Sequence, residues 1–232
     1  MKRIFLTGFL SLLFVGVAFA ETPRIGITAG LNVSNISFNE SGMTVKLNNK
    51  AGFQAGVVAD FGISKNFSIM PELLFAQRGT KLDNFSIDGE TSVSLSTTLN
   101  YLQLPINAAY KFDVGNGSKL FVFAGPYFGY GLSTSGKVKA AGVGVDYNFF
   151  KFGSYNGTDL ENTDAVYLKN FDFGINVGVG YEYEKIFFKL QYNPGLINML
   201  NMGSGDNGSI KNTNFAVSVG YFFNWNNNWI TE

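Results

Sequence analysis

Hydrophobic and polar residues alternate along much of this 232-residue chain. The clearest example is the segment 171–183, in which every odd position is large and apolar or aromatic and every even position is small, polar or charged. Side chains alternate between the two faces of a β-strand, so this segment predicts a strand with one apolar and one polar face. The same pattern recurs less cleanly in seven other segments, which predicts an all-β chain.

Eight strands are predicted from this alternation. They cover residues 24–38, 52–63, 67–75, 102–112, 119–133, 171–183, 186–196 and 214–225. The links at 64–66, 113–118 and 184–185 are short, whereas those at 39–51, 77–98, 134–170 and 197–213 are longer and polar. Outer-membrane β-barrels show this asymmetry, with short periplasmic turns and long external loops. An even number of strands then places both termini of the chain on the periplasmic side.

The first twenty residues are typical of an export signal. Lys2 and Arg3 precede an apolar run at 4–17, and the tripeptide Ala18-Phe19-Ala20 has the small-x-small pattern of a cleavage site. We therefore expect a cleaved signal peptide at 1–20, a barrel domain at 21–225 and a short periplasmic tail at 226–232. The chain has no cysteine, which excludes disulfides, cysteine-based metal sites and acylation on cysteine.

Alternation by itself also fits a soluble, lipocalin-like barrel whose apolar face points inward. Two features favour the inverted arrangement. The polar face is rich in Gly, Asn, Ser and Ala, and small residues suit the narrow interior of an eight-stranded barrel. Aromatic residues also gather at both ends of the apolar face, as at two membrane–water interfaces: Phe61, Phe67, Tyr110, Phe112, Tyr181, Tyr183, Tyr221 and Phe223 at one end, and Phe53, Phe75, Tyr130, Phe171, Tyr192 and Phe215 at the other. The predicted fold is an eight-stranded, antiparallel, up-and-down transmembrane β-barrel.

The dipeptide Asp88-Gly89 is a strong signal for a two-residue hairpin turn. If it forms the tip, residues facing each other have numbers that sum to 177, so Phe75 faces Leu102 and Phe67 faces Tyr110. These residues were all assigned to the apolar face on other grounds. The third and fourth strands are therefore expected to continue beyond the membrane as a projecting ribbon.

Over its whole length, the mature chain resembles the PorT-like outer-membrane β-barrel family of Gram-negative bacteria. The resemblance rests on five motifs taken in order: Ala29-Gly30-Leu31-Asn32, Met70-Pro71-Glu72-Leu73-Leu74-Phe75 with Arg78-Gly79, Tyr101-Leu102-Gln103-Leu104-Pro105, Ala124-Gly125-Pro126-Tyr127-Phe128-Gly129-Tyr130, and Gln191-Tyr192-Asn193-Pro194-Gly195-Leu196. It implies an outer-membrane location and an eight-stranded barrel. It implies little about activity, although one namesake serves protein secretion. The chain departs from usual barrels in continuing past its last aromatic strand residue, Trp225.

Histidine is absent, and this argues against an enzyme. Membrane-barrel hydrolases and acyl transferases use histidine as the general base, and no other side chain titrates near neutrality without a strong shift. The sequence 115–119 fails the P-loop pattern and is interpreted as a turn. The mature chain carries 15 basic and 17 acidic residues, so it has no basic surplus for binding nucleic acid. No cofactor or metal is predicted.

The ionisable residues on the predicted inner face form the candidate functional set. They are Asp60, Glu72, Lys111, Glu182 and Lys189, joined by Gln54, Gln103, Asn107, Asn176 and Gln191. Buried charges must be paired, or each costs several kcal/mol. The set can serve as a salt-bridged plug or as a narrow polar path, and the limited room in eight strands favours the plug.

Two functions follow from these features. The first is a structural or interaction protein of the outer membrane that contacts partners through its external segments at 77–98 and 134–170. The second is a component of a secretion or transport system, or a narrow pore. Outer-membrane lipid is the expected partner in either case, with other envelope or secretion proteins as further partners.

Overall fold

The computed structural model describes residues 22–40, 43–46, 48–87, 91–140, 143–153, 166–201 and 209–223. The predicted signal peptide, the predicted tail and Trp225 lie outside these ranges. Within them, no helix is long and apolar enough to cross a membrane.

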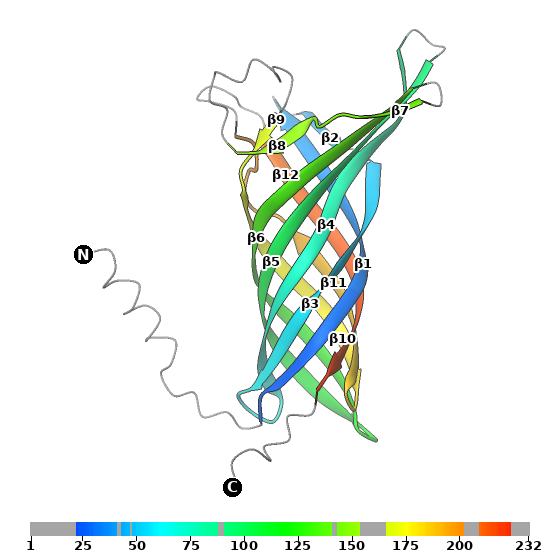
Figure 1. Ribbon diagram of the computed structural model, residues 1–232. Helices are drawn as coiled ribbons and strands as arrows, with labels where there is room; N and C mark the ends of the chain where they lie inside the picture. Colours follow the sequence, from blue (N-terminus) through cyan, green and yellow to red (C-terminus); the bar gives the residue numbers. More distant parts are fainter. Residues whose placement is uncertain are drawn as a thin grey trace, which may run out of the picture.

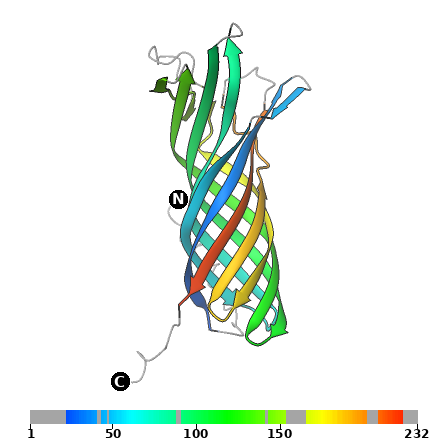
Figure 2. The same ribbon diagram turned by 90° about the vertical axis from the view of Figure 1, so that its right-hand side faces the viewer.

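Eight long strands close into an antiparallel barrel (Figures 1 and 2). In ring order they are β1 (Arg24–Glu40), β3 (Asn48–Gly62), β4 (Phe67–Ile87), β5 (Thr91–Gly115), β6 (Ser118–Ala140), β10 (Phe171–Tyr183), β11 (Ile186–Pro194) and β12 (Ser209–Phe222). The pairing of β12 with β1 and of β6 with β10 closes the ring. The predicted eight-stranded barrel is confirmed.

Four shorter strands lie in segments that were predicted to be irregular links. They are β2 (Met43–Lys46), β7 (Val143–Asp146), β8 (Phe150–Phe152) and β9 (Val166–Leu168). β2 pairs with the end of β1, β7 pairs with the end of β6, and β8 pairs with β9 in a small parallel sheet. The prediction of polar loops at 39–51 and 134–170 is therefore wrong for these parts. The barrel strands β1 and β6 continue and supply backbone partners to β2 and β7, whereas β8 and β9 supply partners to each other.

The opposite end of the barrel has tight connections. Asn116 and Gly117 form a two-residue link between β5 and β6, and both have positive φ angles, 53° and 74°. Positive φ at both central positions is the requirement of the type I′ hairpin turn. Glu184 and Lys185 make the equivalent link between β10 and β11. The prediction of short turns at this end is confirmed.

The register of the β4–β5 hairpin follows the prediction over most of its length. Phe67 pairs with Tyr110 and Leu82 still pairs with Leu95, both sums being 177. A bulge after Leu82 then shifts the register, so that Ile87 pairs with Thr91. The pair Ile87–Thr91 departs from the predicted sum of 177, and the predicted two-residue turn at Asp88-Gly89 lies outside the described ranges.

The predicted ribbon is part of a wider structure that rises beyond the barrel (Figure 2). We call it the projecting sheet: residues 77–87 of β4, 91–100 of β5 and 133–140 of β6, together with β7. β6 accompanies β5 as far as the pair Val93–Ala140. The segment 77–98 is thus mainly strand and not loop.

The apolar face of each strand points outward. Val177 is 38% exposed, whereas its neighbour Asn176 is fully buried. The residues of the two aromatic bands follow the same rule, with Tyr130 at 56% and Phe215 at 48%. A soluble barrel would show the reverse, so the lipid-facing arrangement is the one observed.

The inner face is less uniformly small and polar than the sequence suggested. Phe121, Phe123 and Phe187 point inward and are buried in one apolar cluster. Each ring lies over an inward glycine directly opposite on the next strand; the pairs are Phe121 with Gly180, Phe123 with Gly178, and Phe187 with Gly220. A Cβ atom at Gly180 would overlap the Phe121 ring. The glycines therefore make room for aromatic packing inside the barrel.

Candidate functional site

The structure buries all ten residues of the predicted inner set, each residue being between 0 and 6% exposed. They come from five different strands of the ring and gather in three layers along the barrel axis. A side chain lining a water-filled pore would be accessible to solvent. The lumen is therefore packed by its own side chains at the heights where these residues lie.

The first layer lies at the end with the short turns. Lys111 Nζ is 2.5 Å from Asp60 Oδ2 and 3.5 Å from Glu182 Oε2. Arg24 completes the group, since its guanidinium donates to Glu182 Oε1 at 2.5 Å and also to Asp60. The guanidinium carbon lies 4.2 Å from the centre of the Phe222 ring. Two cations and two carboxylates thus close the end of the barrel with the short turns.

The second layer contains a fully buried ion pair. Lys189 Nζ is 2.5 Å from Glu72 Oε1, and both side chains are 1% exposed. Asn107 donates to the same carboxylate oxygen at 3.2 Å. Asn176 donates to Asn107 at 3.0 Å, and Asn193 donates to Asn176 at 2.6 Å. A chain of amide hydrogen bonds therefore crosses the lumen from the ion pair to β11.

The remaining predicted amides join neighbouring groups. Gln54 donates to the Ser218 hydroxyl at 3.1 Å, and Gln191 donates to Asn193 Oδ1 at 3.3 Å. The first bond joins β3 to β12 across β1, and the second orders two side chains within β11.

The third layer was not predicted as a unit. Arg78 lies 3.4 Å from Asp172 Oδ2 and donates to Gln103 at 2.9 Å. The Tyr127 hydroxyl donates to Asp172 at 3.3 Å. Arg24, Arg78 and Asp172 were all missing from the predicted set, although each has an even number on a strand whose odd positions are apolar. Strict use of that parity would have found them.

Including these residues balances the charge of the lumen. The four buried carboxylates, Asp60, Glu72, Asp172 and Glu182, face the four cations Arg24, Arg78, Lys111 and Lys189. Each cation is within salt-bridge range of at least one carboxylate. The predicted five-residue set had left the carboxylates in excess by one.

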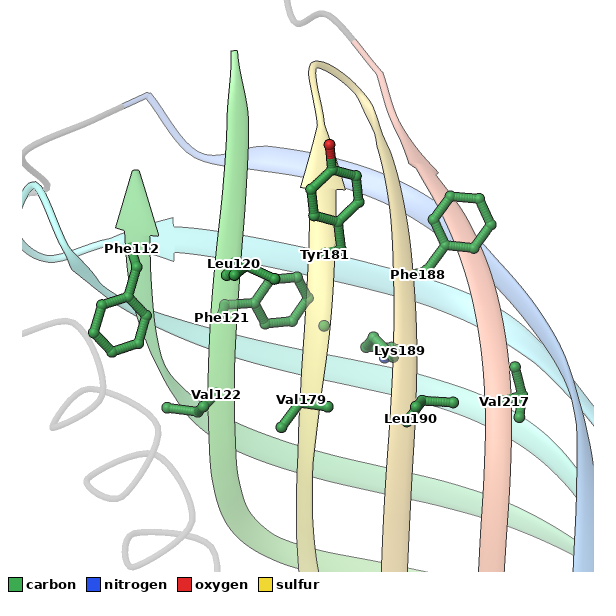
Figure 3. A pocket seen from close by; sticks show the side chains of 11 residues that line it. Phe112, Leu120, Phe121, Val122, Val179, Tyr181, Phe188, Lys189, Leu190 and Val217 are labelled. Atoms are coloured by element: carbon green, nitrogen blue, oxygen red, sulfur yellow. The ribbon is translucent and has the colours of Figure 1, made fainter. Parts of the chain in front are cut away.

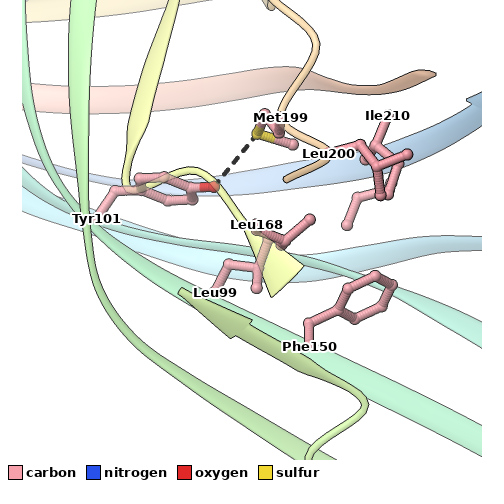
Figure 4. Close-up of a cluster of buried hydrophobic side chains, with 8 residues drawn as sticks. Leu99, Tyr101, Phe150, Leu168, Met199, Leu200 and Ile210 are labelled. Carbon is pink, nitrogen blue, oxygen red and sulfur yellow. Dashed lines mark hydrogen bonds between the residues drawn. The ribbon is translucent and has the colours of Figure 1, made fainter. Parts of the chain in front are cut away.

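An apolar cluster adjoins the third layer (Figure 4): the guanidinium carbon of Arg78 lies 5.9 Å from the centre of the Tyr101 ring, which belongs to the cluster. Tyr101 and Leu99 of β5 contribute to it, as do Phe150 and Leu168 from β8 and β9. The Tyr101 hydroxyl donates to the sulfur of Met199 at 3.5 Å.

In the ranges that the structure describes, no three acidic side chains come together to hold a metal ion. Each of the eight charged side chains in the three layers of the lumen is engaged in an ion pair. The arrangement can join the strands across the lumen and close the barrel.

The outer wall carries a shallow apolar groove of about 430 Å³ (Figure 3). It is bordered by outward side chains, among them Leu120, Val179, Phe188 and Leu190, which are 46–52% exposed. A groove of this composition on the lipid-facing wall suits hydrocarbon chains of the bilayer.

Comparison with known proteins gives one match by family and several by structure. Residues 19–201 match the family described as "outer membrane protein beta-barrel domain". Among solved structures, the outer membrane protein OprG from Pseudomonas aeruginosa is 11% identical, with a TM-score of 0.48, and the match covers 88% of this chain and 97% of that one. Ail, the attachment invasion locus protein of Yersinia pestis, solved with the heparin analogue sucrose octasulfate, is 12% identical, with a TM-score of 0.41 and coverages of 88% and 100%. Neisserial surface protein A is 12% identical, with a TM-score of 0.40 and the same coverages. No curated protein matches the chain.

Proposed function

Because the chain belongs to the outer membrane protein beta-barrel domain family and is a barrel of the Gram-negative outer membrane, we propose that it works through its external surface and not through its lumen. The burial of the lumen carries this proposal: side chains of the ion pairs in all three layers are at most 8% exposed, apart from Arg24 at the periplasmic rim. Eight-stranded barrels have little interior space beyond their own side chains.

The proposal includes the absence of catalysis. The chain has no histidine or cysteine, and the buried carboxylates are all committed to cations or amides. General acid–base catalysis needs a group that is free to exchange protons with a substrate. We infer a structural or interaction role and not an enzymatic one.

Planar-bilayer recording of the purified, refolded protein tests the closed lumen. The expected result is no steady conductance above the bare bilayer, with a porin as positive control. Large and stable single-channel currents would overturn the proposal and favour a conduit.

A second candidate function is that of a subunit in an envelope assembly such as a secretion system, as the resemblance to PorT-like proteins suggests. It is favoured by β7, an edge strand whose Val143 and Val145 are 67% and 60% exposed. Exposed edge strands are templates for pairing with another chain. A photo-crosslinking residue at Val145 is compared with one at Val114, which is 52% exposed at the periplasmic end of β5. If this function holds, only the residue at Val145 captures a defined secretion subunit.

A further inference from the structure

The outer face of the projecting sheet has an ordered arrangement of lysine, hydroxyl and amide side chains. Lys81 of β4, Ser96 of β5 and Lys137 of β6 lie directly opposite one another in a row across three strands. On the side of this row nearer the barrel, Thr98 pairs with Ser135 and Asn100 pairs with Ser133. On its other side, Ser94 pairs with Lys139. We call this set the lysine–hydroxyl face.

Lys50 reaches this face from β3. Its ammonium donates to the Thr97 carbonyl oxygen at 3.1 Å and also to the Thr98 hydroxyl. Its aliphatic stem crosses Gly79, where a Cβ atom would lie only 3.0 Å from Lys50 Cδ. The stem therefore lies flat on the sheet, and the charged end is fixed beside the row that contains Lys81 and Lys137.

The positive charge of this face has little compensation. Among the described side chains, the only carboxylate in salt-bridge range is Asp146, 4.0 Å from Lys137 in a pair with side chains 69% and 86% exposed. Burial lowers the pKa of Lys50, and the charges of Lys81 and Lys137 lower it further. Three cations are thus held close enough to repel one another, which an added anion would relieve.

The face lies at a defined height above the membrane. Its strands continue from Phe53, Phe75 and Tyr130 of the upper aromatic band, with outward residues on the same side of the sheet. Lys81 is six residues beyond Phe75, about 20 Å along the strand at roughly 3.3 Å per residue. In a Gram-negative outer leaflet this zone is filled by the phosphorylated inner sugars of lipopolysaccharide.

We propose that the lysine–hydroxyl face binds the phosphorylated inner carbohydrate of neighbouring lipopolysaccharide molecules. Lys50, Lys81 and Lys137 contact the phosphates as point charges, while Ser96 and Thr98 are placed to hydrogen-bond sugar hydroxyls. The face has no large apolar side chain in its rows, as a protein-binding hot spot would require. This inference deepens the proposed function, since it assigns a partner to the surface outside the lumen.

The test compares two lysine variants in their binding to two forms of one lipid. The protein is refolded in detergent and titrated with deep-rough lipopolysaccharide, which retains only the inner sugars, and with the same lipid after dephosphorylation. The test variant is K50Q/K81Q/K137Q. The matched control is K65Q/K119Q/K185Q, which removes the same charge at the periplasmic turns. Native mass spectrometry measures binding, and migration on unheated gels shows that each variant is folded.

The wild-type protein and the control variant are expected to bind the phosphorylated lipid at least about tenfold more tightly than the dephosphorylated one, a difference of about 1.4 kcal/mol. The test variant should lose this preference. Equal binding of the two lipids by the wild type, or full preference in the test variant, would overturn the proposal. Displacement of the lipid by micromolar inorganic phosphate would instead assign the face to a free anion and overturn the lipid assignment. Conductance tests the lumen separately, so the two proposals fail independently.

Discussion

Two ion pairs of similar composition occupy opposite environments in this molecule. Glu72 and Lys189 in the lumen are each 1% exposed and lie 2.5 Å apart. Lys137 and Asp146 on the projecting sheet are 69% and 86% exposed and lie 4.0 Å apart. The first pair has an added hydrogen bond from Asn107, whereas the second is surrounded by solvent.

The difference shows that the barrel and the projecting sheet use charge for different purposes. In the lumen an unpaired charge would lack water, so each carboxylate needs its cation and the network holds the strands together. On the sheet, water screens the charges and an exposed pair contributes at most about 1 kcal/mol. Charges that contribute little to stability are available for binding.

Breaking the lumen pair should give the largest effect. Glu72→Ala leaves the Lys189 ammonium buried without its carboxylate, and losing one partner of a buried pair costs about 3–5 kcal/mol. The unfolding free energy from urea titration in lipid vesicles measures this loss. The conductance of the variant should stay low, because the surrounding amide side chains still fill the cross-section of the lumen.

The double variant Glu72→Leu/Lys189→Met is the control, since it removes both charges together and should lose less stability than the single variant. An unchanged urea midpoint for Glu72→Ala would mean that the pair is hydrated and that the comparison with Lys137–Asp146 is false.

A charge placed on the lipid face should have the next largest effect. Val177 points outward beside the buried Asn176, so Val177→Arg should destabilise the barrel by about 2–4 kcal/mol if it lies near mid-depth. Val177→Leu keeps the face apolar and should change the unfolding free energy little. Similar values for the two variants in the same vesicles would show that this wall does not face hydrocarbon.

The barrel was predictable because one rule, the alternation of faces, holds along whole strands. It fixed β10 at 171–183 and the β4–β5 register as far as Leu82 and Leu95. It failed beyond the bulge after Leu82, because a single inserted residue changes the pairing and leaves no mark in the pattern. The short strands β8 and β9 were missed because three-residue strands have too few positions to show a period.

Only part of the lumen network could be read from the sequence. The alternation of faces placed Glu72 and Lys189 on the inner side of the barrel. The same alternation places Arg78 and Asp172 there, but Arg78 lies beyond the predicted strand 67–75 and Asp172 lies at the start of the predicted strand 171–183, so neither was included. The aromatic residues inside the barrel were missed for another reason. Phe121 looks lipid-facing by type, and only the pairing with Gly180 shows that an inward ring fits.

That aromatic–glycine pairing should give an effect of middle size. Gly180→Ala places a Cβ where the Phe121 ring lies, and overpacking a core costs about 1–3 kcal/mol. Gly180→Ala/Phe121→Leu should recover part of the loss, because the smaller side chain frees the space. Equal stability of the single variant and the wild type in urea titration would show that the ring moves without cost, so that the lumen is looser than its burial indicates.

The smallest effect is expected on the projecting sheet, where charge should alter a titration and hardly alter stability. The folded state lowers the pKa of Lys50, chiefly through burial and then through the charges of Lys81 and Lys137. Folding therefore disfavours protonated Lys50: the penalty is present below the folded pKa and fades as the pH rises towards the unfolded pKa. K81Q/K137Q should raise the pKa of Lys50 towards its ordinary value while changing the unfolding free energy by less than about 1 kcal/mol.

NMR titration of lysine labelled at Cε measures the pKa in micelles, with K65Q/K119Q as the control that leaves it unchanged. If the pKa of Lys50 does not change in K81Q/K137Q, the charges of Lys81 and Lys137 do not act on Lys50. The three lysines would then not form one anion-binding face.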